Sequence, residues 1–135
     1  MALNKYLLDT HCLIWFQKNN PQLSKHALSI IEDPDNIILF SQVSLFELVI
    51  KQTLGKIPEF IVSTEDVYSQ GKTDGFIFEP IQNNHIQRYS EVPLFDNHRD
   101  PFDRLLIATA MEENAVIISG DEKFTLYKDM IRLIW

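Results

Sequence analysis

Short apolar runs, many of them rich in β-branched residues, recur along the chain and alternate with segments in which apolar positions repeat at helical spacing. Almost wholly apolar runs of four residues are typical of strands covered on both faces. The five predicted strands are Lys5–Leu8, Ile37–Phe40, Phe76–Glu79, Val116–Ser119 and Ile131–Ile134. This alternation predicts an α/β fold with a doubly wound parallel sheet of about five strands and helices on both faces.

Five segments are predicted as helices: Leu23–Glu32, Val43–Leu54, Thr64–Lys72, Asn84–Val92 and Pro101–Asn114. The last has the strongest signal, because Asp100 is a suitable N-cap and proline is favoured in a first helical turn. Gly55 is suited to end the second helix, and the Asp33-Pro34 pair ends the first. The longest irregular stretch, Glu91–Arg99, leads into the last helix, and long loops at such places often carry function.

Length and composition predict a single domain, 1–135, of ordinary globular character. The chain has 135 residues, of which 45% are hydrophobic. No apolar run approaches the roughly 18 residues of a membrane-spanning helix, and the N-terminus lacks a secretory pattern. The lone cysteine, Cys12, excludes an intramolecular disulfide. We therefore expect a cytoplasmic protein that does not associate with membranes.

The charge balance argues against a basic nucleic-acid-binding surface. Twelve Lys and Arg stand against 19 Asp and Glu, which gives a formal net charge of −7. Proteins that bind phosphate backbones normally present a basic face. This objection weakens where carboxylates cluster around metal ions, because bound cations reverse the local charge.

Acidic residues stand where predicted strands end and at the starts of the helices beside them. In open α/β sheets ligands bind beyond the carboxyl ends of the strands. The residues in question are Asp9 after the first strand, Glu47 in the helix after the second, Asp100 and Asp103 at the start of the last helix, and Asp121 after the fourth strand. Their common placement predicts that Asp9, Glu47 and Asp103 share one acidic pocket.

A divalent metal explains why acids would gather there. Mg²⁺ and Mn²⁺ are hard cations that prefer oxygen ligands. A metal held by carboxylates can activate water and stabilise the charge on a phosphodiester during attack. Without a cation, crowded carboxylates would raise each other's pKa.

Each acid also has a purely structural interpretation. Asp9 could cap a helix that follows it. Ser44 and Glu47 match the spacing of a capping box, which by itself favours a structural role for Glu47. Asp121 could be a turn residue after Gly120. The functional interpretation depends on the joint arrangement.

The start of the last helix has the same ambiguity. Asp100 is a natural N-cap, and Asp103 is an acid in the first turn, where the helix dipole favours it. Asp100 could also pair with Arg104, four residues on.

Histidines provide no second candidate site. His11, His26, His85 and His98 are far apart in sequence and lack zinc-site spacing. For His11 and His98, which are near acidic residues, a surface or supporting role is favoured.

Three stretches of the chain resemble PIN-domain ribonucleases, especially the toxin components of VapBC-type toxin–antitoxin pairs. The stretches are YLLDTHCLIW (6–15), SQVSLFELVIKQTLGKI (41–57) and NHRDPFDRLLIATAMEENAVIISGDEKF (97–124). They occur in the same order as in the family and, with the strand between them, cover nearly the whole chain. Their combination is specific, whereas each stretch alone is not.

The resemblance implies a central parallel sheet and an acidic site that binds Mg²⁺ or Mn²⁺. It assigns catalytic and metal-binding roles to Asp9, Glu47, Asp103 and Asp121. It places Thr10, Ser44 and Ser119 as hydroxyl residues near the site, with Asp100 as a helix cap. Ser119 stands where threonine is commoner in the family. The resemblance also implies an RNA substrate, a cognate antitoxin and a homodimer.

The leading hypothesis is therefore a metal-dependent endoribonuclease, the toxin of a toxin–antitoxin pair. One alternative is a degenerate PIN-type module that binds without catalysis. Another is a different Mg²⁺-dependent phosphate-handling α/β domain. A haloacid-type phosphatase would carry DxDxT where this chain has Asp9-Thr10-His11, and a receiver domain would end its third strand in Asp where this chain has Glu79-Pro80.

Overall fold

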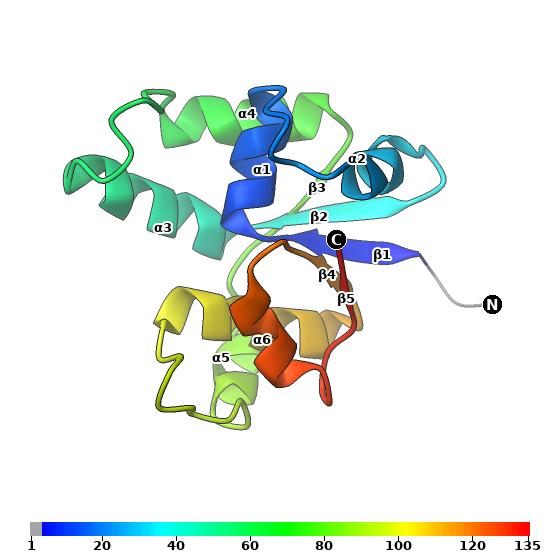
Figure 1. Ribbon diagram of the computed structural model, residues 1–135, viewed down its shortest axis with the longest axis vertical. Helices are drawn as coiled ribbons and strands as arrows, with labels where there is room; N and C mark the ends of the chain where they lie inside the picture. Colours follow the sequence, from blue (N-terminus) through cyan, green and yellow to red (C-terminus); the bar gives the residue numbers. More distant parts are fainter. Residues whose placement is uncertain (1–3) are drawn as a thin grey trace.

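The computed structural model describes residues 4–135, and at its centre is a five-stranded, entirely parallel sheet (Figure 1). The strands are β1 (Lys5–Leu8), β2 (Ile37–Ser41), β3 (Ile77–Glu79), β4 (Val116–Ile118) and β5 (Leu133–Ile134). Their order is β3-β2-β1-β4-β5, so the chain winds outward from β1 first in one direction and then in the other. This confirms the predicted doubly wound α/β fold.

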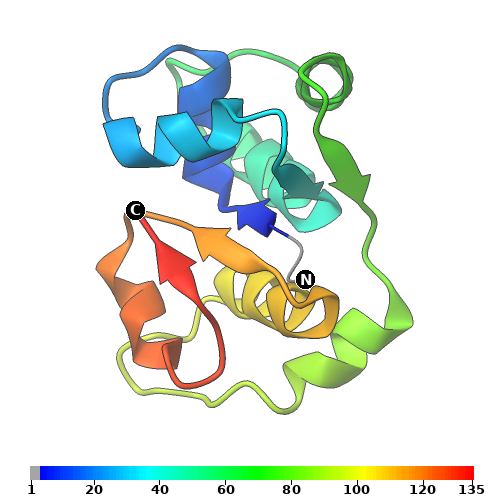
Figure 2. The same ribbon diagram turned by 90° about the vertical axis from the view of Figure 1, so that its right-hand side faces the viewer.

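Helices cover both faces of the sheet (Figures 1 and 2). They are α1 (Thr10–Gln17), α2 (Lys25–Glu32), α3 (Gln42–Thr53), α4 (Thr64–Thr73), α5 (Asn83–Tyr89), α6 (Pro101–Glu113) and the 3₁₀ helix η1 (Glu122–Tyr127). One core joins the sheet to α6 and η1, and the other joins it to α1, α2 and α4. Helix α3 contributes Val43 to the first core and Leu48 to the second. It therefore lies at the boundary between the two layers.

Sheet pairing sets strand ends that differ from the apolar runs. Four residues belong to predicted strands but lie outside the observed ones: Phe76, Ser119, Ile131 and Arg132. Phe76 and Ile131 are buried all the same, so their apolar character reflects core packing. Ser41 extends β2 by one residue because it pairs with Glu79 of β3.

Most helix boundaries lie within two residues of the prediction. The Ser24 side chain accepts a hydrogen bond from the Ala27 amide, so α2 begins at Lys25 rather than at Leu23. Helix α5 ends at Tyr89, three residues before its predicted end. Helix α6 begins at Pro101 behind its N-cap Asp100, as predicted.

Two helices had no predicted range. Helix α1 is apolar at five of its eight positions, Cys12 to Phe16 in one run, and so shows little helical periodicity. The 3₁₀ helix η1 is too short for a periodic signal. None of the helices formed by residues 4–135 is long and apolar enough to cross a membrane.

Candidate functional site

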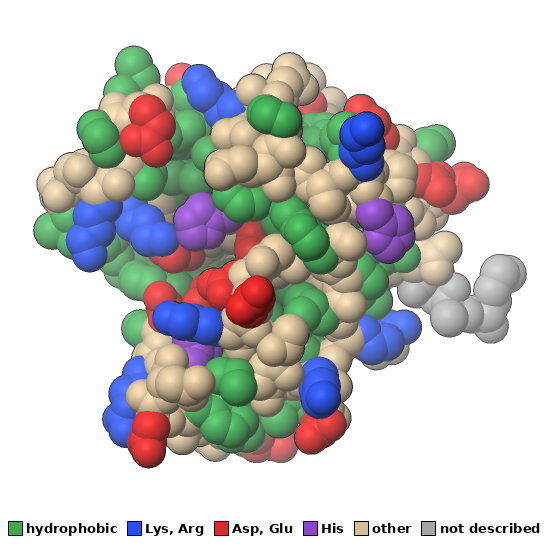
Figure 3. Space-filling view, viewed as in Figure 1, with side chains coloured by type: hydrophobic (Ala, Val, Ile, Leu, Met, Phe, Trp, Pro, Cys, Tyr) green, Lys and Arg blue, Asp and Glu red, His purple; other side chains and the backbone are tan. Residues whose placement is uncertain are grey.

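The carboxyl edge of the sheet forms an acidic hollow of about 150 Å³ between the two layers. Its lining residues are Asp9, Thr10, His11, Glu47, Lys51, His98, Asp100, Asp103, Asp121, Lys123 and Phe124. In the space-filling view, acidic side chains gather between the upper and lower halves of the molecule (Figure 3). All four acids to which the sequence assigned a metal-binding role line this hollow, but among the described residues only Glu47 and Asp103 of the four belong to a close group of carboxylates.

Asp9 follows β1 and serves as the N-cap of α1. Its Oδ1 accepts a hydrogen bond of 2.7 Å from the Cys12 amide, and its Oδ2 accepts one from the Ser119 hydroxyl. The side chain is buried, and burial raises the pKa of Asp9, although these hydrogen bonds lower it. The capping role is therefore real, and it holds the carboxylate beside the hollow.

Glu47 is held by two partners and does not belong to a capping box. Helix α3 starts at Gln42, and its N-cap is Ser41, whose hydroxyl accepts from the Val43 amide at 3.0 Å. The capping-box interpretation of Ser44 and Glu47 is therefore wrong, because Glu47 lies in the second turn and faces the hollow.

The partners of Glu47 come from two helices. The Thr10 hydroxyl lies 2.7 Å from Glu47 Oε1 and 2.9 Å from the Ser44 hydroxyl. An ionised carboxylate only accepts, so Thr10 donates to Glu47 and accepts from Ser44. On the other oxygen, Lys51 Nζ lies 2.9 Å from Oε2, one helical turn further along α3. Lys51 is a site residue that sequence reasoning missed, although its i,i+4 spacing from Glu47 was a usable signal.

Asp100 and Asp103 complete a group of three carboxylates with Glu47. One oxygen from each lies within 4.8 Å of the others. Asp100 Oδ1 also accepts from the amides of Phe102 and Asp103, at 2.8 and 3.1 Å. Asp100 therefore caps α6, as predicted, and also lies close enough to the other acids to share a cation.

The suggested Asp100–Arg104 ion pair does not form. Arg104 turns away and donates to the Tyr89 hydroxyl and to the Val92 carbonyl, both at 2.7 Å. The buried guanidinium also lies over the Tyr89 ring, with 4.5 Å between its carbon and the ring centroid. Packing against α5 and its following loop therefore outweighs an exposed pair within one helix.

Asp121 lines the hollow and is exposed. Its side chain accepts from the Lys123 amide at 3.0 Å and so caps η1. Its own amide donates to the Ser119 hydroxyl at 3.0 Å. Because Ser119 donates to Asp9, it joins the acids that follow β1 and β4.

The electrostatics of the hollow favour a cation. Burial, together with the charges of Asp100 and Glu47, raises the pKa of Asp103 to about 6, although a hydrogen bond from His98 lowers it. All the grouped donors are carboxylate oxygens, which suit Mg²⁺ or Mn²⁺. The residues present therefore fit a hard divalent ion.

His98 occupies a supporting position beside the acids. The residue is 3% exposed, and its Nε2 lies 3.0 Å from Asp103 Oδ2. Its Nδ1 lies 2.6 Å from the hydroxyl of Tyr127, which is fully buried in η1. Of the two roles that the sequence favoured, the structure shows the supporting one. No sequence spacing pointed to Tyr127, which lies 29 residues away.

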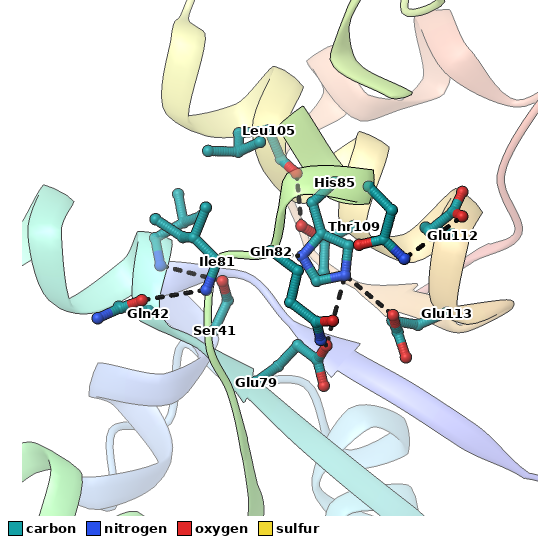
Figure 4. A network of polar contacts seen from close by, with 12 residues as sticks. Ser41, Gln42, Glu79, Ile81, Gln82, His85, Leu105, Thr109, Glu112 and Glu113 are labelled. Atoms are coloured by element: carbon teal, nitrogen blue, oxygen red, sulfur yellow. Dashed lines mark hydrogen bonds and ion pairs between the residues drawn. The ribbon is translucent and has the colours of Figure 1, made fainter. Parts of the chain in front are cut away.

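A second group of metal-ligand types, made of Glu79, His85 and Glu113, has a structural role (Figure 4). The Gln82 amide donates to His85 Nδ1 at 3.2 Å, so the ring proton is on Nε2. Nε2 faces Glu113 at 2.9 Å and Glu79 at 3.4 Å. A metal on Nε2 would move this proton to Nδ1, against the Gln82 amide. The group instead ties α5 to α6 and to the end of β3.

Several solved structures share this fold. A DNA-bound VapBC from Salmonella typhimurium matches with a TM-score of 0.65 at 16% identity, over 98% of both chains. VapBC-1 from nontypeable Haemophilus influenzae matches with 0.63 at 19%, over 96% of both. VapBC2 from Rickettsia felis, bound to a promoter DNA fragment, matches with 0.61 at 18%, over 96% of this chain and 97% of that one.

Sequence comparison identifies the family. No curated protein sequence matches the chain. The model of the PIN domain family, in contrast, matches residues 6–129, which include β2, β3, β4, all but the first residue of β1, and all four of the acids assigned from sequence. On this match, together with the sheet order and the fold shared with the VapBC structures, the chain belongs to the PIN domain family.

Proposed function

We propose that this protein is a metal-dependent endoribonuclease, the toxin of a toxin–antitoxin pair. PIN domains are typically nucleases. The observation that carries the proposal is the acidic hollow, where carboxylates from four separate segments line one space. Crowding like charges in this way is costly unless a cation binds among them.

Asp9, Glu47 and Asp103 would hold Mg²⁺ or Mn²⁺, and Asp121 would complete the site. The ion would supply a polarised water and a positive charge opposite the phosphodiester. The protein positions the carboxylates: Ser119 donates to Asp9, and Thr10 donates to Glu47. A carboxylate of the hollow would accept the proton of the attacking water.

The same geometry suggests how an antitoxin would inhibit the enzyme. The similar solved structures are VapBC complexes, which motivates a cognate antitoxin for this chain. We expect an Arg or Lys side chain of the antitoxin to lie near Asp9 and Asp103, because a cation there replaces the charge of the metal. A complex in which the antitoxin leaves the hollow open would contradict this expectation.

The test of the function is cleavage of RNA by the purified protein. Total RNA incubated with Mg²⁺ or Mn²⁺ is expected to yield discrete fragments, and a chelator is expected to suppress them. Asp103→Asn should be inactive, because it removes one of the proposed carboxylate ligands from the group formed with Glu47 and Asp100. Asp66→Asn is the matched control, since Asp66 holds the same position in the first turn of α4, is exposed and does not line the hollow.

Two outcomes would contradict the proposal. Cleavage that survives in Asp103→Asn would come from a contaminating nuclease or another site. RNA binding without cleavage under either metal would favour the degenerate binding module instead.

A further inference from the structure

His98 makes a chain of contacts that ends on a carboxylate of the acidic hollow. It lies in the loop between α5 and α6, and its backbone amide donates to the Phe95 carbonyl at 3.1 Å. The ring packs edge-on against Tyr127, with centroids 5.4 Å apart. Backbone and ring are therefore both held in place, and the side chain has little freedom to move.

The proton positions on the ring follow from its two partners. Asp103 in its ionised form only accepts, so Nε2 carries a proton and donates to Oδ2 at 3.0 Å. In the neutral ring Nδ1 is then an acceptor, and it takes the proton of the Tyr127 hydroxyl at 2.6 Å. Among residues 4–135, Tyr127 is the only hydrogen-bond partner of Nδ1, and Asp103 is the only partner of Nε2. The buried tyrosine thus selects the tautomer that can donate to Asp103.

The hydrogen bond from His98 fixes the orientation of the Asp103 carboxylate. The Asp103 amide is already bound to Asp100, so the first turn of α6 fixes its backbone. Within residues 4–135 only Oδ2 of its carboxylate accepts a hydrogen bond, and the nearest charges, on Asp100 and Glu47, repel it. Without a donor on Oδ2, this repulsion would turn the carboxylate away from the other acids.

We propose that His98 is a positioning residue for the divalent ion, which orients the Asp103 carboxylate toward Glu47 and Asp100 by a donated hydrogen bond that Tyr127 directs. The proposal rests on the function proposed above, because it assigns His98 a role toward the same ion. Hydrogen-bonded partners of metal ligands typically contribute 10- to 100-fold in metal affinity.

The experiment measures Mn²⁺ affinity, from the free-ion signal in electron paramagnetic resonance, and the thermal midpoint of each metal-free variant. His98→Asn places an amide near the position of Nδ1, too short to reach Asp103. His98→Gln places an amide near Nε2 and keeps the donor. We expect His98→Asn to lose about 10- to 100-fold in affinity and His98→Gln to stay within about threefold of the wild type.

Tyr127→Phe removes the hydroxyl and leaves the imidazole in place, so it tests the contact chain without changing His98. We expect it to weaken Mn²⁺ binding about threefold to tenfold, within the range of such indirect contacts. Tyr68→Phe is the matched control, because the Tyr68 hydroxyl contacts Lys72 within α4 and the side chain packs against the other core, away from His98 and Asp103. Its affinity should equal that of the wild type.

Equal Mn²⁺ affinity in the wild type and His98→Asn overturns the proposal, whatever happens to the thermal midpoint. Equal losses in the Asn and Gln variants also overturn it, since the ring would then act by packing. If His98→Asn does not fold, unchanged affinity in Tyr127→Phe overturns the directing role of Tyr127. If the wild type itself binds no Mn²⁺, the proposed function is overturned. This outcome differs from a loss of affinity that occurs only in the variants, which concerns the role of His98.

Discussion

At the scale of single residues, most acids of the hollow serve the fold and the candidate site together. Asp9 caps α1 and Asp121 caps η1, yet both line the hollow. Asp100 caps α6 and approaches Glu47 and Asp103. Glu47 is different, because it caps nothing and its contacts come from Thr10 and Lys51. Capping and metal binding are therefore separable at some positions only, and this guides the choice of variants.

Asp103→Asn separates the two roles in α6. If Asp103 acts mainly in the first helical turn, losing its charge should cost about 0.5 to 1 kcal/mol of stability without metal. We instead expect metal-free stability to stay unchanged or to rise, because repulsion from Asp100 and Glu47 decreases. The stabilisation by Mn²⁺ should disappear. Thermal melts with and without Mn²⁺ measure both effects.

Asp66→Asn is the control for this variant. Asp66 holds the same position in the first turn of its helix, α4, as Asp103 holds in α6, but it lies outside the hollow. The control variant should lose a few tenths of a kcal/mol and keep the response to Mn²⁺. A loss of metal-free stability in Asp103→Asn with a normal metal response would contradict the assignment of Asp103.

The pKa of Asp103 predicts a pH dependence. Burial raises this pKa from 3.8 to about 6, so the folded protein holds the proton more tightly than the unfolded chain. The associated stability is fully present below pH 3.8 and is lost as the pH rises through 6. The difference between the two pKa values corresponds to roughly 3 kcal/mol. Mn²⁺ binds the ionised form, so its stabilising effect should grow over the same pH window.

Melts of the metal-free protein between pH 4 and 7 test this dependence. Because other carboxylates also titrate in this range, the measurement compares the stability of the wild type with that of Asp103→Asn at each pH. The stability of the wild type relative to the variant should fall as the pH rises. If the difference in stability between the two proteins stays constant from pH 4 to 7, the Asp103 carboxyl titrates as it does in the unfolded chain.

At the scale of elements, the site depends on where helices begin and on what holds their connections. Strands β1 and β4 end side by side, which places Asp9 beside Ser119. Helix α3 begins directly after β2, which puts Glu47 one and a half turns above the sheet edge. The loop after α5 brings in His98, and Arg104 of α6 holds that loop by the Val92 carbonyl.

Arg104→Lys tests that connection. A lysine keeps the charge but cannot contact Tyr89 and Val92 at once, nor lie flat over the Tyr89 ring. We expect a loss of about 2 to 3 kcal/mol in urea unfolding, because a buried charge loses a partner. Arg99→Lys is the control, since Arg99 is exposed and pairs with an exposed Asp96. An equal loss in both variants would indicate that charge alone matters at position 104.

At the scale of the whole molecule, the acidic hollow and the net charge of −7 favour cations, and α3 presents apolar side chains to solvent. Phe46 and Val49 of α3, and Leu54 at its C-cap, are between 41% and 62% exposed. Exposed apolar side chains along one helix often mark an interface between proteins.

Millimolar Mn²⁺ or Mg²⁺ should raise the thermal midpoint of the protein. An ion bound only by the folded state stabilises by mass action, by about 2.7 kcal/mol when its concentration is 100 times the Kd. For a domain of this size the shift is roughly 5–10 °C. Scanning fluorimetry in Mg²⁺, Mn²⁺ and Ca²⁺ measures it. A midpoint that none of these ions moves would count strongly against the site.

The resemblance to VapBC-type toxins implies a homodimer, and we propose that it forms through the outer surface of α3. A carboxylate in that interface would be desolvated without a partner, so Leu54→Asp should shift the protein toward the monomer in light scattering. Leu94→Asp is the matched control, since Leu94 is 56% exposed and Leu54 is 62% exposed, but Leu94 lies in the loop before α6. A dimer that persists in Leu54→Asp but dissociates in Leu94→Asp would place the interface elsewhere.

Local pattern was enough to predict the parallel α/β sheet and the cap of α6. Strand runs, helical periodicity and capping residues act over a few neighbouring positions, so they can be read without distant contacts. The rule that ligands bind at carboxyl strand ends then indicated which acids should share a pocket, and all four line the hollow. The same local rules failed at α1, where apolar residues on every side hid the helix.

Contacts between distant segments decided the rest. Ser44 and Glu47 matched a capping box, but the pairing of Ser41 with Glu79 and its cap on Val43 set where α3 begins. Arg104 left its neighbour Asp100 for Tyr89 and Val92, because a buried pair of hydrogen bonds outweighs an exposed ion pair. The contact of His98 with Tyr127 spans 29 residues. Such contacts exist only once the layers have packed, because packing removes water as the competing partner and so decides which polar groups meet.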